Sequence, residues 1–190
     1  MIPFNIELEV KLDATNINES LFRKWIFNKD PYRTLIVEGY DQFYRRGEDI
    51  ARLRLCPDDP FQLTIKKRKS LQSIRDRKEV DLEVGRDAAL VHDFLELDGY
   101  TTDIKIFKKA HIFWIKQGKG EVVVSYYTAQ KDIDGTLSEP KAYVEIEVAK
   151  GSQIEVDTGK GWLKRWLDEI NEEFKAELIP LNQSLFELFS

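Results

Sequence analysis

Five segments of the chain alternate apolar and charged side chains, and this alternation constrains the fold more than any other sequence feature. In the first, residues 6–12, every second residue is Ile, Leu or Val, and Glu7, Glu9 and Lys11 stand between them. Successive side chains of a strand point to opposite faces, so each segment predicts a strand with one charged face. The charged faces of the other four contain, in chain order, Arg52 and Arg54; Thr64, Lys66 and Arg68; Arg77, Glu79, Asp81 and Glu83; and Tyr143, Glu145 and Glu147.

The charges are unevenly distributed along these segments. Carboxylates gather in the first and last segments, whereas cations gather between Arg45 and Lys78. A single charged strand face is most simply a solvated surface. Five such strands together predict one shared polar interior, because a closed barrel can turn its charged faces inward.

A polar interior that holds both signs of charge suits a polyanion bound together with a metal ion. Arginine and lysine hold phosphate oxygens, and arginine can do so with two parallel hydrogen bonds. Mg²⁺ and Mn²⁺ prefer oxygen ligands such as carboxylates. We therefore expect Glu7, Glu9, Glu145 and Glu147 to bind Mg²⁺ or Mn²⁺, while the cations of the middle strands contact phosphates.

Hydrophobic periodicity and turn residues predict an α+β chain of about eight strands in a single domain, residues 1–190. Helices are expected over Asn16–Phe27, Asp87–Leu97 and Thr158–Glu177, with a short terminal turn or helix over Ser184–Phe189. The expected strands are Asn5–Leu12, Tyr40–Arg46, Asp49–Cys56, Phe61–Lys69, Ser73–Val84, Asp103–Gln117, Gly120–Tyr127 and Ala142–Ala149.

Composition excludes several other classes of protein. Hydrophobic residues make up 42% of the chain and charged residues 33%, a balance too apolar for a disordered chain. The net charge of −5 argues against nucleic acid as a partner. No apolar run reaches the ~20 residues of a membrane helix, and residues 1–11 lack the apolar core of a signal peptide. One cysteine, Cys56, and two histidines predict neither disulfides nor a Cys- or His-based metal site, and a cytoplasmic location is expected.

An ordered set of short motifs along nearly the whole chain resembles the CYTH superfamily, the triphosphate tunnel metalloenzymes. Glu7-x-Glu9-x-Lys11 is similar to the ExExK signature of that family. Further matches, in chain order, are Asp41-Gln42-Phe43-Tyr44, Arg52-Leu53-Arg54, Leu63-Thr64-Ile65-Lys66, Arg77-Lys78-Glu79-Val80-Asp81, Val144-Glu145-Ile146-Glu147-Val148 and Ser184-Leu185-Phe186-Glu187-Leu188. The resemblance implies an eight-stranded antiparallel β-barrel, a tunnel with a charged interior and peripheral helices.

The resemblance also implies roles for individual residues. It implies catalytic roles for Glu7, Glu9, Lys11 and Lys66, and metal binding by Glu7, Glu9, Glu79, Glu145 and Glu147. It implies that a triphosphate is bound by Lys11, Arg52, Arg54, Lys66, Arg77 and Lys108.

Two positions depart from the pattern of the family. The family has a Lys-x-Arg pair after its middle helix; here Lys108 supplies the lysine, and Ala110 or His111 stands where the arginine is expected. On the next strand, Ser125 stands where the family has an aspartate. The connection Tyr126–Pro140 is longer than usual, which suggests a lid or a partner-binding loop. These departures favour binding over catalysis as the activity that is retained.

The expected function is metal-dependent hydrolysis of a triphosphate-containing substrate, whether nucleoside, thiamine or inorganic triphosphate. The first alternative is a class IV adenylyl cyclase, which makes cyclic AMP and pyrophosphate from ATP with the same phosphate contacts. The second is a non-catalytic nucleotide or polyphosphate binder, which Ala110 and Ser125 favour. The third is an RNA-binding module built on the Arg45–Lys78 region. The sequence leaves a homodimer open.

Overall fold

The computed structural model describes the backbone of residues 6–57, 59–66, 75–175, 178 and 180–190, and the side chains of these residues except 6, 7, 66 and 75–79. Within these ranges the strands are β1 (Ile6–Asp13), β2 (Arg33–Arg46), β3 (Asp49–Leu55), β4 (Gln62–Lys66), β5 (Arg75–Glu83), β6 (Thr101–Gln117), β7 (Gly120–Ile133), β8 (Thr136–Leu137) and β9 (Lys141–Val148). The helices are α1 (Glu19–Phe27), α2 (Ala88–Leu97), α3 (Val156–Phe174) and α4 (Leu185–Phe189).

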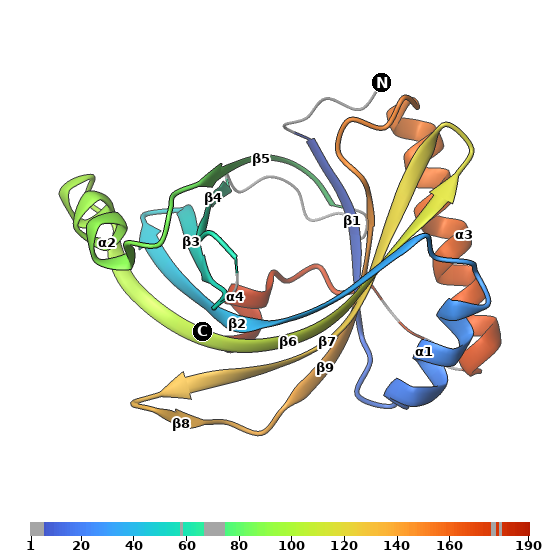
Figure 1. The fold of residues 1–190 in the computed structure, drawn as a ribbon, viewed down its shortest axis with the longest axis horizontal. Helices are drawn as coiled ribbons and strands as arrows, with labels where there is room; N and C mark the ends of the chain where they lie inside the picture. Colours follow the sequence, from blue (N-terminus) through green and yellow to red (C-terminus); the bar gives the residue numbers. More distant parts are fainter. Residues whose placement is uncertain (1–5, 58, 67–74, 176–177, 179) are drawn as a thin grey trace.

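The strands form one antiparallel sheet. Their order across it is β6-β2-β3-β4-β5-β1-β9-β7-β8, and β6 also pairs with β7. This further pairing runs from Lys105 opposite Asp132 to Gln117 opposite Gly120, so β6 lies beside β7 along most of its length. The sheet is strongly curved, and its strands surround a concave side (Figure 1).

The main hydrophobic core lies on the convex face of the sheet. Leu8, Val10 and Leu12 of β1 are buried there, together with apolar residues of β6, β7 and β9. Helices α1 and α3 cover this face (Figure 1). Their buried side chains are Phe22, Trp25 and Ile26 of α1 and Trp162, Leu163, Trp166 and Ile170 of α3. The helical spacing of these residues gives each helix one apolar stripe, which it buries against the sheet.

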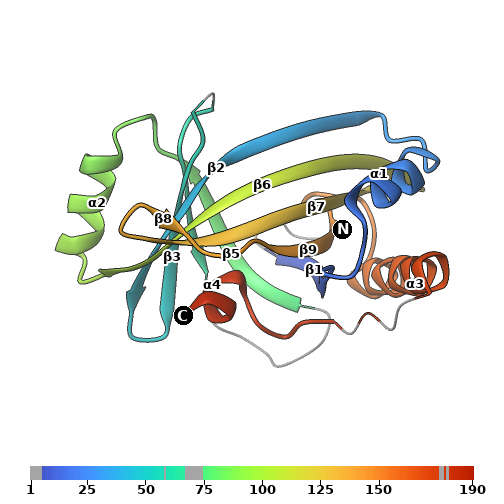
Figure 2. The ribbon, with the colours of Figure 1, turned by 90° about the horizontal axis from the view of Figure 1, so that it is seen from below.

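Two smaller cores involve the other helices, which lie away from α1 and α3 (Figure 2). Val91 and Leu95 of α2 pack with buried residues of β2, β3 and β4. Helix α4 begins with a capping box between Ser184 and Glu187 and buries its apolar side chains with residues of β2, β6, β7 and β9. One of these is Phe43, whose ring centroid lies 5.7 Å from that of Phe186.

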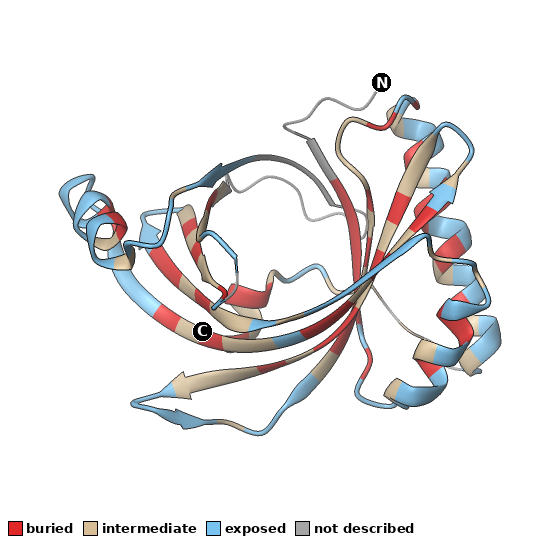
Figure 3. Cartoon of the chain, in the orientation of Figure 1, coloured by how far each residue is buried: buried red, intermediate tan, exposed pale blue. Residues whose placement is uncertain are grey.

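Apolar packing on the convex face determines where the charged side chains lie. Buried and less buried residues alternate along the strands (Figure 3). In β1, however, Glu9 and Lys11 are themselves buried, at 1% and 4% exposed, although they alternate with core residues. Their side chains therefore point to the concave side rather than to bulk water.

Comparison with the sequence expectations confirms the α+β class, the antiparallel sheet and the peripheral helices. The described sheet has nine strands rather than eight, and the closed eight-stranded barrel remains a prediction. Strand β2 begins at Arg33 and not at Tyr40. Residues 34–37 form a continuous apolar and β-branched run, which lacks the alternation that identifies a half-buried strand. No helix of the described residues is long and apolar enough to span a membrane.

The Tyr126–Pro140 connection is mostly strand, not the loop expected from the sequence. Strand β7 continues to Ile133, and a turn at Asp134-Gly135, both at positive φ, leads into the two-residue strand β8. The long partner strand β6 explains the extension, because it hydrogen-bonds β7 as far as Asp132.

Gly39 provides a test of the packing between β2 and the end of β3. A Cβ atom at this position would lie 2.4 Å from the carbonyl oxygen of Leu55. We expect Gly39→Ala to lower the free energy of unfolding by about 1–3 kcal/mol, as overpacking typically does. Urea unfolding measures the change.

Gly161→Ala is the matched control. Gly161 lies inside α3, and a Cβ atom there would meet nothing within 4 Å. This substitution is expected to raise the free energy of unfolding by about 0.5–1 kcal/mol, because alanine favours the helix. Equal stability of Gly39→Ala and the wild type would contradict the close approach at Leu55.

Candidate functional site

Asp41 of β2, which is buried, and Arg54 of β3, which is partly buried, form a two-point ion pair. Nε of Arg54 donates to Oδ1 of Asp41 at 2.8 Å, and Nη2 donates to Oδ2 at 3.0 Å. Burial alone would raise the pKa of Asp41, but the cations of Arg54 and Arg52 hold it well below its usual range. The two parallel bonds fix the plane of the Arg54 guanidinium.

A second chain of contacts begins at Arg52 of β3. Its Nη2 donates to Oγ1 of Thr64 at 3.0 Å, and Oγ1 of Thr64 donates to Oδ1 of Asp81 at 2.7 Å. Nζ of Lys150, in the loop after β9, donates to the other oxygen of Asp81. Nε of Arg52 is buried and has no hydrogen-bond partner in the described part of the chain. Unsatisfied buried donors are rare in native proteins, and a ligand that accepts from this N–H group would satisfy it.

A third group of contacts connects β1, β6, β7 and β9. Nζ of Lys11 lies 3.5 Å from Oε2 of Glu145, and Oη of Tyr127 donates to the same oxygen at 3.2 Å. Nζ of Lys108 lies 3.6 Å from the ring centroid of Tyr127. The side chain of Tyr127 is fully buried. Burial, with the nearby charges of Glu145 and Glu9, raises the pKa of the Tyr127 hydroxyl well above its usual value.

Lys108 connects these groups electrostatically. Burial lowers the pKa of its ammonium to about 8, although the charges of Glu145 and Asp41 oppose the shift. The cations of Arg54 and Lys11 add to the shift, because like charges disfavour the protonated form. The ion pair of Asp41 and the contacts of Glu145 therefore belong to one continuous cluster.

The remaining predicted residues are placed by strand register. Glu9 stands opposite Glu147, and Lys11 opposite Glu145, across β1 and β9. Glu7 stands opposite Arg77, and Lys66 opposite Glu79, but the side chains of these four residues lie outside the described part of the chain. Among the described residues, no group of three or more His, Cys, Asp or Glu side chains is arranged to hold a metal ion. Metal binding therefore stays a prediction.

The described cluster is balanced in charge. Its cations are Lys11, Arg52, Arg54, Lys108 and Lys150, and its carboxylates are Glu9, Asp41, Asp81, Glu145 and Glu147. Glu9 and Glu147 stand opposite each other across β1 and β9, and carboxylate oxygens are the ligands that Mg²⁺ and Mn²⁺ prefer. Guanidinium and ammonium groups held among them can bind phosphate oxygens.

Several residues that the sequence predicts for the site lie together in the structure, and the cluster also contains residues that were not predicted. Predicted residues in the cluster are Glu9, Lys11, Arg52, Arg54, Lys108, Glu145 and Glu147. Site residues that were not predicted are Asp41, Thr64, Asp81, Tyr127 and Lys150. Asp41, Thr64 and Asp81 share a motif or a strand face with predicted residues. This shared position is the sequence signal that could have identified them as site residues. Tyr127 shares the alternation of β7 with Ser125, which stands opposite Glu145.

The structure distinguishes the two candidates for the missing arginine. Ala110 is two residues after Lys108 on β6, so both side chains lie on the same face of the strand. His111 lies on the opposite face, and its Nε2 is 3.2 Å from Oε1 of Glu19 in α1. Burial lowers the pKa of His111. The alanine therefore occupies the inward position, and the imidazole contacts a helix on the convex side.

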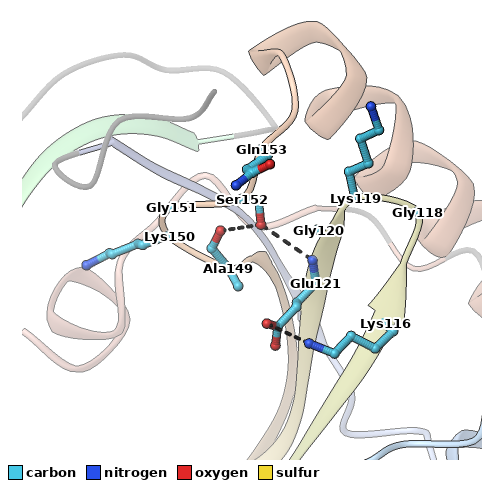
Figure 4. A pocket seen from close by; sticks show the side chains of 10 residues that line it. All are labelled: Lys116, Gly118, Lys119, Gly120, Glu121, Ala149, Lys150, Gly151, Ser152 and Gln153. Carbon is cyan, nitrogen blue, oxygen red and sulfur yellow. Dashed lines mark hydrogen bonds and ion pairs between the residues drawn. The ribbon is translucent and has the colours of Figure 1, made fainter.

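A pocket of about 250 Å³ lies apart from the predicted site residues, between the β6–β7 turn and the loop after β9 (Figure 4). Three lysines, Glu121, Gln153 and small residues line it. Lys116 bonds Glu121 at 3.1 Å, whereas Lys150 points away from the other side chains and bonds Asp81. None of the residues that the sequence predicted for the site lines this pocket.

Comparisons with solved structures identify proteins of similar fold. PH1819 of Pyrococcus horikoshii is 20% identical, with 96% of this chain and 97% of that chain covered and a TM-score of 0.66. A chain of the Schizosaccharomyces pombe Mediator head module is 12% identical, with 92% and 97% covered and a TM-score of 0.55. S. pombe RNA triphosphatase Pct1 is 10% identical, with 92% and 81% covered and a TM-score of 0.44.

These likenesses concern the fold alone. All three identities are below the level at which a function is carried over, and the likeness to Pct1 is too slight to support an argument. No family model matches the chain, and the search of curated proteins gave no match. The chain therefore shares its fold with an archaeal protein and with a Mediator component, and its function must be argued from its own residues.

Asp41→Asn tests the buried ion pair. The amide keeps the shape of the side chain but leaves the partly buried Arg54 guanidinium without its carboxylate. We expect the free energy of unfolding to fall by about 2 kcal/mol, typical of a hydrogen bond to a charged group. Because the folded pKa of Asp41 is depressed, the difference from the wild type should be full above about pH 4 and be lost progressively as the pH falls from there toward the depressed pKa of the folded state.

Urea unfolding at several pH values measures this difference. The matched control is Asp49→Asn, which removes the exposed carboxylate that lies 3.3 Å from Arg46. An exposed pair of this kind contributes about 0–1 kcal/mol. If both substitutions lowered the free energy of unfolding equally, the ion pair of Asp41 would contribute no more to stability than an exposed pair, which would contradict this prediction.

Proposed function

We propose that this protein is a metal-dependent phosphohydrolase that acts on a triphosphate-containing substrate, held in a tunnel on the concave side of the sheet. The observation that supports this most is the buried Nε of Arg52, which has no hydrogen-bond partner among the described residues although Nη2 of the same side chain bonds Thr64. A donor in that position needs an acceptor, and a phosphate oxygen supplies one.

The charge balance of the cluster supports the metal requirement. The described part of the cluster contains five cations and five carboxylates, so these residues together add no excess positive charge for a triphosphate. A divalent cation on the carboxylates would supply that excess next to the phosphates. Bound there, such an ion would supply positive charge beside the phosphates, where negative charge develops in phosphoryl transfer.

Each predicted residue has a role in this proposal. Glu7, Glu9, Glu79, Glu145 and Glu147 would hold Mg²⁺ or Mn²⁺. The triphosphate would be held by Lys11, Arg52, Arg54, Lys66, Arg77 and Lys108. Asp41 and the Thr64–Asp81 contacts would fix the two arginine side chains before the substrate arrives, which is how charge stabilisation avoids a reorganisation cost.

A non-catalytic binder of nucleotides or polyphosphate is the second candidate, and two positions favour it. Ala110 faces the same side as Lys108 and provides no cation. Ser125 stands opposite Glu145 and provides no carboxylate. Both departures from the family pattern remove charge from the half of the site formed by β6 and β7. Strand β3, in contrast, keeps both arginines, Arg52 and Arg54.

One incubation series separates these candidates. The purified protein is incubated with Mg²⁺ or Mn²⁺ and with ATP, GTP, thiamine triphosphate or inorganic triphosphate, and the products are resolved by chromatography and phosphate assay. Release of orthophosphate supports the hydrolase and identifies its substrate. Cyclic AMP with pyrophosphate would instead identify an adenylyl cyclase. Binding without turnover would support the non-catalytic candidate.

Glu9→Gln is the sharpest substitution for the proposed metal site. The amide preserves the volume of this buried side chain but removes the charge that a metal ligand needs. We expect turnover to be abolished while circular dichroism stays that of the folded wild type. Glu48→Gln, at an exposed turn position, is the control and should keep full activity. Full activity of Glu9→Gln would refute the assignment of the site.

The depressed pKa of Lys108 predicts a pH dependence of binding. The protonated ammonium attracts phosphate, so affinity should fall as the pH rises from about 7 to about 9. Calorimetric titration with the non-hydrolysable imido analogue of triphosphate and Mg²⁺ measures this. Lys108→Met should bind more weakly at pH 7 and lack the fall between pH 7 and 9. An identical pH profile in the variant would show that Lys108 does not contact the ligand.

A further inference from the structure

Tyr127 lies on β7, between the strands that carry Lys108 and Glu145. Its hydroxyl donates to Oε2 of Glu145 at 3.2 Å, and Nζ of Lys11 lies 3.5 Å from that same oxygen. The ammonium of Lys108 lies over its ring, with Nζ 3.6 Å from the ring centroid. One fully buried side chain therefore contacts two predicted phosphate-binding lysines, one directly and the other through a single carboxylate.

We propose that Tyr127 is a positioning residue that sets the separation and direction of the Lys11 and Lys108 ammonium groups. This inference rests on the proposed function, since it concerns how the same site holds a chain of phosphates. The tyrosine itself makes no contact with the substrate in this proposal; it acts through the two lysines.

The physical need for such a residue follows from the flexibility of lysine. A lysine ammonium is a hydrated point charge on a long flexible stem, and it loses rotamer freedom when it binds a ligand. Two ammonium groups that contact successive phosphates must also be held at a defined spacing. A buried ring holds one ammonium by cation–π attraction. The hydroxyl orients the carboxylate that holds the other, as outer-shell partners do for ligating groups.

The ring and the hydroxyl act on different lysines, so two substitutions separate their effects. Tyr127→Phe keeps the ring below Lys108 and removes only the bond to Glu145. Tyr127→Leu removes both. The chain also offers a matched control in Tyr143, which is 2% exposed and whose ring centroid lies 5.4 Å from that of Tyr127. In the described part of the chain, the hydroxyl of Tyr143 bonds none of the charged residues of the cluster.

The test measures affinity for the imido analogue of triphosphate with Mg²⁺ by calorimetry. Tyr127→Phe should weaken binding about fivefold, the scale of one typical net hydrogen bond, and Tyr127→Leu should weaken it further. Tyr143→Phe should stay within about twofold of the wild type, because it keeps the ring and removes a hydroxyl that bonds none of the charged residues in the described cluster. Thermal unfolding checks that each variant is folded.

A double-substitution cycle distinguishes positioning from a general loss of structure. If the hydroxyl acts through Lys11, Tyr127→Phe should have almost no further effect in a Lys11→Met background. An equal effect in both backgrounds, or equal effects of Tyr127→Phe and Tyr143→Phe, would overturn the proposal. Unchanged affinity in Tyr127→Phe would overturn it as well, while the proposed function stands. Failure of the wild type to bind the analogue would refute both.

Discussion

Charged side chains buried on the concave side of a curved sheet are the constraint on which the rest of this structure depends. Glu9, Lys11 and Asp41 are each less than 5% exposed. Removing such groups from water is costly unless each has a charged or hydrogen-bonding partner. The sheet meets this need by placing opposite charges on neighbouring strands, as with Asp41 and Arg54 or Lys11 and Glu145. Strand register and side-chain chemistry are therefore coupled.

The convex face supplies the apolar burial that offsets this cost. Helices α1 and α3 cover β1, β9 and β7, and α2 packs against residues of β2, β3 and β4. Helix α4 packs beside Phe43 and Tyr127, close to the charged cluster. A rigid scaffold of this kind holds charged groups in place before a ligand arrives. These groups can then stabilise the charge of the ligand without a free-energy cost for rearranging the site. The same rigidity makes Tyr127 an effective support for flexible lysines.

Alternation in the sequence predicted much of the site. It placed Glu9 and Lys11, Arg52 and Arg54, and Glu145 and Glu147 on charged strand faces, and their strands do pair in one antiparallel sheet. It missed the first half of β2, because Thr34-Leu35-Ile36-Val37 does not alternate. It missed the extension of β7, because that strand is held by hydrogen bonds to β6, from a different part of the chain. Tyr127 was missed because an aromatic residue in an apolar run carries no sign of a polar role.

The sequence by itself determined which residues share a strand face, because the side-chain period of two is a local property of the backbone. It also determined the chemistry of those faces, with carboxylates near both ends of the chain and cations between them. Only the tertiary structure decided which faces meet and which residue points where. The face of Lys108 and Ala110 points to the concave side while His111 contacts Glu19 of α1, and Arg52 is left with a buried donor lacking a partner among the described residues. These outcomes depend on register between strands far apart in the chain, which no local pattern encodes.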